Sequence, residues 1–235
     1  MLSKAEEWQM ITENPLSRFK LATIDSIAKV RYLTSEEETR LKNAINARDE
    51  QLKLSRKRFN TWKHERGLQP LPDRMAFTFA DHMAPMIQIS LHTGPRQGEV
   101  FNLKWENVNY ERATIAIAGN TAKNGKTRHI PLNSVALQVL SNWQKQSQPN
   151  DLIFPGKNGD KFNNVKKAWT SLLKSAQIDN FRWHDMRHHF ASKLVMAGVD
   201  LNTVRELLGH ADIKMTLRYA HLAPEYKASA VEKLV

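Results

Sequence analysis

A histidine and an arginine stand three residues apart in the stretch WHDMRHHF, and both side chains can hold an anion. At about 100° per residue, a helix through this stretch places His184 and Arg187 on one side. The apolar residues expected on that side are Ala191, Leu194 and Val195. The polar residues expected on the opposite, wetter side are Asp185, His189, Ser192 and Lys193. An unpaired charge beside apolar residues is costly, so His184 and Arg187 require an anionic partner, either a carboxylate of the fold or a ligand.

Three kinds of site use such a pair. The simplest is a structural ion pair within the fold. A metal site is the second, because His184 and His188 are four residues apart, a spacing found on zinc-binding helices. The surrounding sequence supports it poorly, since Asp185 stands where the HExxH pattern has a glutamate and no third ligand is marked. A phosphate site is the third.

Other basic residues favour the phosphate site. In TGPRQGE, Arg96 stands at the start of a predicted helix, where its guanidinium and the helix N–H groups can bind one phosphate. Lys123 lies in the predicted hairpin TAKNGK, which can project it into a groove. In LLGHADIKMTLRYAHL, His210 follows a glycine and Tyr219 comes nine residues later. Taken singly, Arg96 and Lys123 are equally well explained as solvated surface residues.

Read in order, the residues that share this chemistry are Arg96, Lys123, His184, Arg187, His210 and Tyr219. Together they resemble the active site of the tyrosine recombinases, the phage-integrase family. The resemblance runs from RYLTSEEETRLKNAI to the C-terminus and is closest in HDMRHHFASKLVMAGVDLNTVRELLGHADIKMTLRYAHL. It implies the tyrosine-recombinase catalytic-domain fold, which is mainly α with a small antiparallel β-sheet (α+β). It also implies site-specific DNA recombination by a phage or mobile-element integrase.

The resemblance assigns each residue a role in strand cleavage and rejoining. Tyr219 is the nucleophile that attacks the scissile phosphate and forms a 3′-phosphotyrosyl intermediate, and His184 is expected to help it lose its proton. Arg96 and Arg187 neutralise the phosphate oxygens in the transition state. The remaining roles are a hydrogen bond from His210 to the phosphate and protonation of the leaving 5′-oxygen by Lys123. With these groups present, no metal or other cofactor is expected.

Helices must position most of these residues. TSEEE marks a helix start, with Thr34 or Ser35 as the N-cap and Glu37 or Glu38 at the capping-box position, and the helical pattern continues to Gly67. Further helices are predicted over 80–94, 96–105, 132–146 and 162–177. From 184 onward, helices are predicted with breaks at Gly198, Gly209 and Pro224.

A small sheet is predicted in the middle of the chain. RATIAIA, at 112–118, alternates apolar and other residues as a strand does. Asn124-Gly125 then predicts a hairpin turn into a second strand. DLIF, at 151–154, is expected to be a short strand or extended segment.

Two domains are expected. Residues 1–32 are interpreted as a remnant of the N-terminal core-binding domain, with its last helix over 3–13, followed by a linker. Residues 33–235 are interpreted as the catalytic domain. The C-terminal segment APEYKASAVEKLV can form an amphipathic helix. In relatives such a helix docks onto a neighbouring protomer, which implies a homotetramer on DNA, and docking on its own body is the alternative.

Composition limits the partners. The chain has 235 residues, a net charge of +11 and no cysteine, which excludes disulfides and thiolate metal sites. The positive charge favours a polyanion, and the expected partner is double-stranded DNA carrying attachment sites. Neither a signal peptide nor a membrane span is visible, so we expect a cytoplasmic, nucleoid-associated protein with no membrane partner.

Three rival functions remain. A type IB topoisomerase shares this active site but relaxes supercoils without exchanging strands. A catalytically silent DNA-binding regulator on the same fold has no use for Tyr219. A metal-dependent nuclease requires a divalent cation and leaves no covalent adduct.

Overall fold

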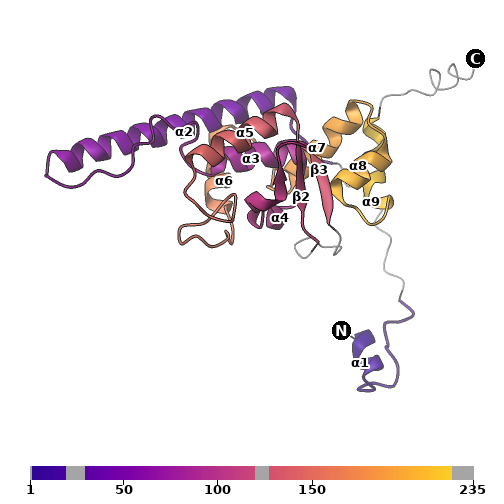
Figure 1. The fold of residues 1–235 in the computed structure, drawn as a ribbon. Helices are drawn as coiled ribbons and strands as arrows, with labels where there is room; N and C mark the ends of the chain where they lie inside the picture. The colour runs from indigo at the N-terminus through magenta and orange to yellow at the C-terminus, as the bar shows by residue number, and fades with distance from the viewer. Residues whose placement is uncertain (1, 20–29, 120–126, 224–235) are drawn as a thin grey trace, which may run out of the picture.

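A computed structural model describes residues 2–19, 30–119 and 127–223. Helices surround one small antiparallel sheet (Figure 1), which confirms the predicted fold class. In chain order the elements are α1 (Leu2–Glu7), α2 (Ser35–His64), α3 (Met83–Thr93), α4 (Gln97–Phe101), the 3-10 helix η1 (Trp105–Asn107), β1 (Val108–Asn109), β2 (Thr114–Ile117), β3 (Arg128–Pro131), α5 (Ser134–Gln146), α6 (Lys166–Ser175), α7 (Asp185–Met196), α8 (Leu201–Leu208), α9 (Lys214–Leu217) and the 3-10 helix η2 (Ala220–Leu222).

Helix α2 begins at the predicted capping box. The Glu37 N–H donates to the Thr34 hydroxyl at 3.2 Å, and the Thr34 N–H donates to the Glu37 carboxylate at 3.0 Å. The first half of α2 buries Leu41 and Ile45 against the body, while the second half extends away from it (Figure 1). In the part of the chain that the structure describes, no helix is long and apolar enough to cross a membrane.

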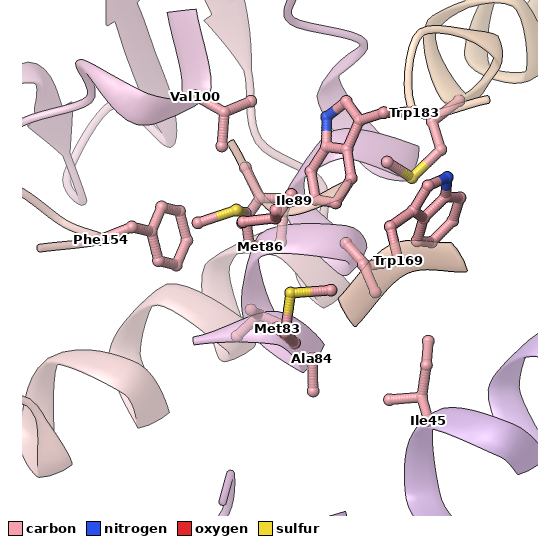
Figure 2. Packing of buried hydrophobic residues seen from close by; sticks show 14 of the residues in the cluster. Ile45, Met83, Ala84, Met86, Ile89, Val100, Phe154, Trp169 and Trp183 are labelled. Atoms are coloured by element: carbon pink, nitrogen blue, oxygen red, sulfur yellow. The ribbon is translucent and has the colours of Figure 1, made fainter. Parts of the chain in front are cut away.

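The hydrophobic core is built around α3. This helix is apolar on most of its surface and is correspondingly buried, as expected of a helix inside a fold. Figure 2 shows Met83 and Met86 of α3 among Phe154, Trp169 and Trp183, which come from distant parts of the chain. Helices α5 and α7 pack directly on α3. The core therefore fixes α7, which carries Arg187 and begins just after His184, against the C-terminal end of α3.

The predicted hairpin strands form a sheet in the order β1-β2-β3. Ile115 of β2 pairs with Ile130 of β3 in antiparallel register, and both are buried. The predicted turn at Asn124-Gly125 lies outside the described residues. The sequence does not indicate β1, because its two residues are too few to show alternation.

Three helix boundaries differ from the prediction. The helix expected over 96–105 divides into α4 and η1, because the chain after α4 pairs with an extended segment instead. Ile153 N–H donates to Leu103 C=O at 2.8 Å, and Trp105 N–H donates to Asp151 C=O at 3.0 Å. The helix expected over 162–177 is α6, which begins only at Lys166, and the helix expected over 3–13 is α1, which ends at Glu7.

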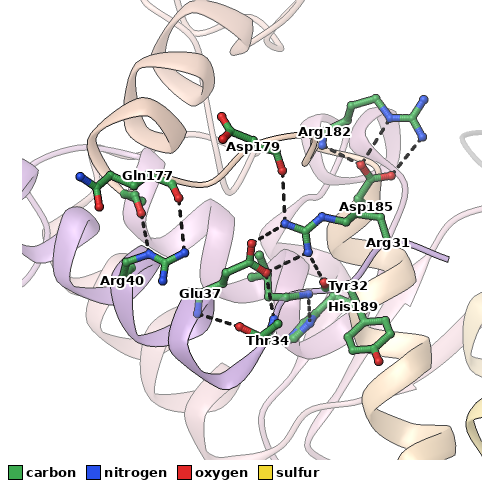
Figure 3. A network of polar contacts seen from close by, with 12 residues as sticks. Arg31, Tyr32, Thr34, Glu37, Arg40, Gln177, Asp179, Arg182, Asp185 and His189 are labelled. Atoms are coloured by element: carbon green, nitrogen blue, oxygen red, sulfur yellow. Dashed lines mark hydrogen bonds and ion pairs between the residues drawn. The ribbon is translucent and has the colours of Figure 1, made fainter. Parts of the chain in front are cut away.

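The expectation that α7 has a wet side is wrong for most of its residues. Asp185, His189 and Ser192 are buried, and only Lys193 of that set is exposed. Figure 3 shows the reason at two of these positions. Asp185 accepts hydrogen bonds from the Arg182 backbone and side chain, and His189 Nδ1 accepts from the Leu33 N–H at 3.2 Å. Because α3, α8 and the segment before α2 all pack on α7, Asp185 and His189 bond to the fold, while the Ser192 hydroxyl is buried without a hydrogen-bond partner among the described residues.

Candidate active site

Arg187 joins the C-terminal ends of two helices. Its Nη1 donates to the Gly94 carbonyl at 2.8 Å, and its Nη2 donates to the Leu208 carbonyl at 2.5 Å. These carbonyls lie at the ends of α3 and α8, where the helix dipole is negative and favours a cation. Only 3% of Arg187 is exposed. Burial, followed by the charges of Arg96 and Arg128, lowers the pKa of Arg187 to about 9, so it remains cationic at neutral pH.

Both helix ends need glycine. Gly94 has φ = 62° and Gly209, after α8, has φ = 66°, a left-handed conformation that other residues rarely adopt. A Cβ on Gly94 would lie 2.4 Å from the Phe190 ring, and one on Gly209 would lie 2.8 Å from Arg128 Cδ. The absence of a side chain at Gly94 lets the end of α3 approach Phe190 of α7, and its absence at Gly209 lets the end of α8 approach Arg128 of β3. These elements therefore meet around Arg187.

Arg96 stands immediately before α4 and is held by Glu99. The Glu99 carboxylate accepts from the Arg96 N–H at 2.7 Å and from Arg96 Nη1 at 2.9 Å. It also accepts from Arg128 Nη1 at 3.0 Å and Nη2 at 2.7 Å. Burial acts to raise the pKa of Glu99, but the hydrogen bonds and charge of Arg128 outweigh it and the pKa is lowered. Glu99 is thus a buried anion that contacts the guanidinium groups of Arg96 and Arg128.

His210 follows Gly209 and is held by the next short helix. Its Nδ1 lies 2.9 Å from the hydroxyl of Thr216 in α9, and both residues are buried. Burial, with Arg187 and Arg96, lowers the pKa of His210 to about 3. His210 is therefore a neutral imidazole fixed beside two arginines.

Tyr219 lies between α9 and η2, and only 1% of it is exposed. Its hydroxyl is 2.6 Å from Nδ1 of His188, on the second turn of α7. Burial raises the pKa of Tyr219 to about 12, so the phenol is protonated at neutral pH. Burial, and next the neighbouring His184, lowers the pKa of His188 to about 4. A neutral imidazole and a neutral phenol therefore share this hydrogen bond.

His184 stands at the N-terminal end of α7, beside His188. The two rings meet edge to face with their centroids 5.2 Å apart. The pKa of His184 is lowered, first by partial desolvation of its ring and then by Arg187. Within residues 2–19, 30–119 and 127–223, no group of three or more His, Asp or Glu side chains is placed to hold a metal ion.

The fold brings the predicted site residues of the described chain into one region. Arg96, Arg187 and His210 influence one another electrostatically, as the pKa of His210 shows, and Arg187 also acts on Tyr219. Lys123 lies outside the described residues.

Three residues that support this region were not singled out by the sequence, namely Glu99, Arg128 and Thr216, and a fourth, His188, was considered there only as a possible metal ligand. Glu99 alone carried a signal, since it stands three residues after Arg96, at the capping-box spacing.

The chain resembles known proteins over the region that holds this site. The model of the phage integrase family matches residues 74–226. The integrase of Salmonella phage P22 is 31% identical over 153 residues, which are 60% of this chain and 39% of that protein. Tyrosine recombinase XerA of Pyrococcus horikoshii is 31% identical over 145 residues, or 60% of this chain and 50% of that protein. The matched region thus spans half or less of these curated relatives.

Solved structures show the same fold. The Tn1549 transposon integrase, in complex with transposon right end DNA, superposes with a TM-score of 0.69 at 22% identity, covering 99% of this chain and 75% of that one. The catalytic domain of bacteriophage HP1 integrase gives a TM-score of 0.58 at 22% identity, covering 86% of this chain and 94% of that one. The described fold is that of a tyrosine-recombinase catalytic domain. Since the family model also matches well over half of its residues, the chain belongs to the phage integrase family.

Proposed function

We propose that this chain catalyses site-specific DNA recombination by cutting and rejoining strands through a 3′-phosphotyrosyl intermediate. The observation that carries the proposal is the position of Tyr219, whose hydroxyl lies in the same buried region as Arg187. A tyrosine beside fixed cations can attack an anionic phosphodiester that those cations bind. Membership of the phage integrase family and similarity to proteins named integrase and tyrosine recombinase support it.

Each side chain then has a role in the transfer. Arg96 and Arg187 bind the non-bridging phosphate oxygens, and His210 donates a further hydrogen bond to them. Because Gly94 and Leu208 hold Arg187 and Glu99 holds Arg96, these donors need little reorganisation when the transition state forms. His184, at the N-terminal end of α7, assists deprotonation of Tyr219, as the family resemblance implies. Lys123 protonates the 5′-oxygen as it leaves.

The proposed partner is double-stranded DNA that carries attachment sites. The net charge of +11 supports a polyanionic partner. We propose residues 1–32 as the end of a separate DNA-clamping domain and 33–235 as the catalytic domain. We also propose that the segment after Pro224 links protomers into a homotetramer on DNA.

The test is strand exchange between two duplexes. The cleavage sequence is first obtained by selecting covalent protein–DNA complexes from a random-sequence duplex library. Two differently labelled duplexes with that sequence are then incubated with the full chain. We expect recombinant duplexes to form from both labels. Relaxation of a supercoiled plasmid without exchange would instead assign a topoisomerase, and binding without either reaction would assign a DNA-binding regulator.

A further inference from the structure

We propose that His188 is the group that accepts the proton of Tyr219 during attack on the phosphate. This inference rests on the proposed function, and it gives His188 a catalytic role that the family resemblance implies for His184. The reason is that the imidazole of His188 contacts the Tyr219 oxygen, which is the atom that attacks the phosphate.

The contact is direct. The Tyr219 oxygen lies 2.6 Å from His188 Nδ1, and the two ring centroids are 5.9 Å apart with the rings tilted by 46°. His184 meets the ring of His188 and lies one turn of α7 before it. Among the described residues, the side-chain hydrogen bond found for the Tyr219 hydroxyl is the one to His188. A proton acceptor must lie within hydrogen-bond reach of the proton it takes, and His188 meets this condition.

The protonation states suit a proton acceptor. Tyr219 is a neutral phenol, and His188 is a neutral imidazole with a lone pair on one ring nitrogen. The imidazole nitrogen is the better acceptor of the pair and the phenol is the better donor. We therefore place the His188 proton on Nε2 and leave Nδ1 free to accept from Tyr219.

The charges around His188 explain how phosphate binding promotes the transfer. The groups that face His188 are His184, Asp185 and Arg187 of α7, together with Arg218 beside Tyr219. The arginines oppose a positive charge on its ring. A bound phosphodiester is an anion and offsets the arginines, so it raises the pKa of His188 and favours the imidazolium. A bound substrate thus shifts the protonation equilibrium toward the His188 imidazolium.

The step balances without another reactant. The O–H bond of Tyr219 breaks, and its proton moves to Nδ1 of His188, which becomes an imidazolium. The Tyr219 oxygen forms a bond to phosphorus as the bond from phosphorus to the 5′-oxygen breaks, and the 5′-oxygen takes the proton that the proposed function assigns to Lys123. In the reverse attack, the 5′-hydroxyl returns that proton to Lys123 and displaces Tyr219, and the imidazolium returns its proton to the phenolate.

The test compares His188→Asn with His184→Asn, the same substitution one turn earlier in α7. The amide oxygen of asparagine can occupy the place of Nδ1 and accept a hydrogen bond, but it cannot hold a proton. The probe is a nicked duplex, chosen by selecting covalent adducts from a random-sequence library, in which sulfur replaces the bridging 5′-oxygen. A thiol, with a pKa of about 8.5, leaves without protonation, so the rate reports on the nucleophile.

We expect wild-type adduct formation to be nearly independent of pH between about 6 and 8, because His188 is already an available base there. His188→Asn should be slower by about 100-fold at pH 7. Its rate should rise about tenfold per pH unit, as hydroxide replaces the missing base. Whatever its rate, His184→Asn should keep the flat profile, because His188 remains to accept the proton. Thermal unfolding of both variants within a few degrees of wild type would show that they are folded.

Two results would overturn the inference. One is a flat pH profile and a wild-type rate for His188→Asn. The other is a pH-dependent rate for His184→Asn alone, which would return the role to His184. A wild-type protein that forms no adduct with any duplex of the library would refute the proposed function itself, which distinguishes that failure from the failure of this inference.

Discussion

Replacing Glu99 with glutamine tests the ion pairs beneath the site. The carboxylate accepts from Nη1 and Nη2 of Arg128 and from the backbone and side chain of Arg96. Glutamine keeps the shape, but it replaces one acceptor oxygen with an NH2 donor that faces other donors. The Glu99 side chain is 1% exposed and that of Arg128 is 10% exposed. Water therefore cannot replace the carboxylate in stabilising the charge of Arg128. Removing one partner of a buried pair costs about 3–5 kcal/mol, and we expect a loss in that range.

Urea unfolding followed by tryptophan fluorescence measures this loss. With a slope of about 2 kcal/mol per molar urea, the midpoint of Glu99→Gln should fall by about 1.5–2.5 M. Glu206→Gln is the matched control, since Glu206 pairs with Arg205 at 3.2 Å but its side chain is 64% exposed. An exposed pair contributes about 0–1 kcal/mol, so the control should unfold close to wild type.

A double variant separates the ion pair from packing. In Glu99→Gln/Arg128→Met the uncompensated charge of Arg128 is gone, so part of the lost stability should return and the two substitutions should not be additive. Equal losses for Glu99→Gln and Glu206→Gln, or strict additivity in the double variant, would refute the idea that Glu99 neutralises buried cations.

Two further predictions concern stability. Gly94→Ala should be destabilising by more than about 1 kcal/mol in urea unfolding, because φ is 62° and a Cβ meets Phe190 at 2.4 Å. Its control, Gly98→Ala in α4, meets nothing within 4 Å and should be neutral or stabilising, and the reverse order would contradict the packing described. The folded-state pKa values of His188 and His210, about 4 and about 3, lie below the unfolded value, so stability is full above pH ~6.5 and falls as the pH falls toward 4. We expect a loss of about 3 kcal/mol for the pair between pH 7 and 5, and an unchanged free energy of unfolding over that range would show that these histidines are not held neutral.

Local sequence signals predicted much of the fold. The capping box at Thr34 and Glu37 depends on residues three apart, and it marks the start of α2 correctly. Gly94 and Gly209 follow the last residues of α3 and α8 in the left-handed conformation that glycine adopts readily. Such signals involve neighbours in the chain, so they can be found without knowing the fold.

The parts that the sequence did not predict depend on contacts between distant residues. Arg128 reaches Glu99 across 29 positions, and Tyr219 reaches His188 across 31. No periodicity marks either pair. The buried polar side of α7 was missed for the same reason, because a helical projection assumes one face in water while α7 is enclosed by several elements. Sequence pattern alone thus did not reveal these pairs, whereas the family resemblance pointed to residues as far apart as Arg96 and Tyr219.

The most direct measurement is covalent capture of DNA by Tyr219. A nicked duplex with the selected cleavage sequence is incubated with the full chain in the presence of a chelator, and the products are separated on a denaturing gel. We expect wild-type protein to form a protein–DNA adduct whose DNA is attached by its 3′-phosphate to the peptide that contains Tyr219. Tyr219→Phe should bind the same duplex and form no adduct. An adduct that persists in Tyr219→Phe, or cleavage that requires a divalent cation and leaves no adduct, would contradict the proposed chemistry.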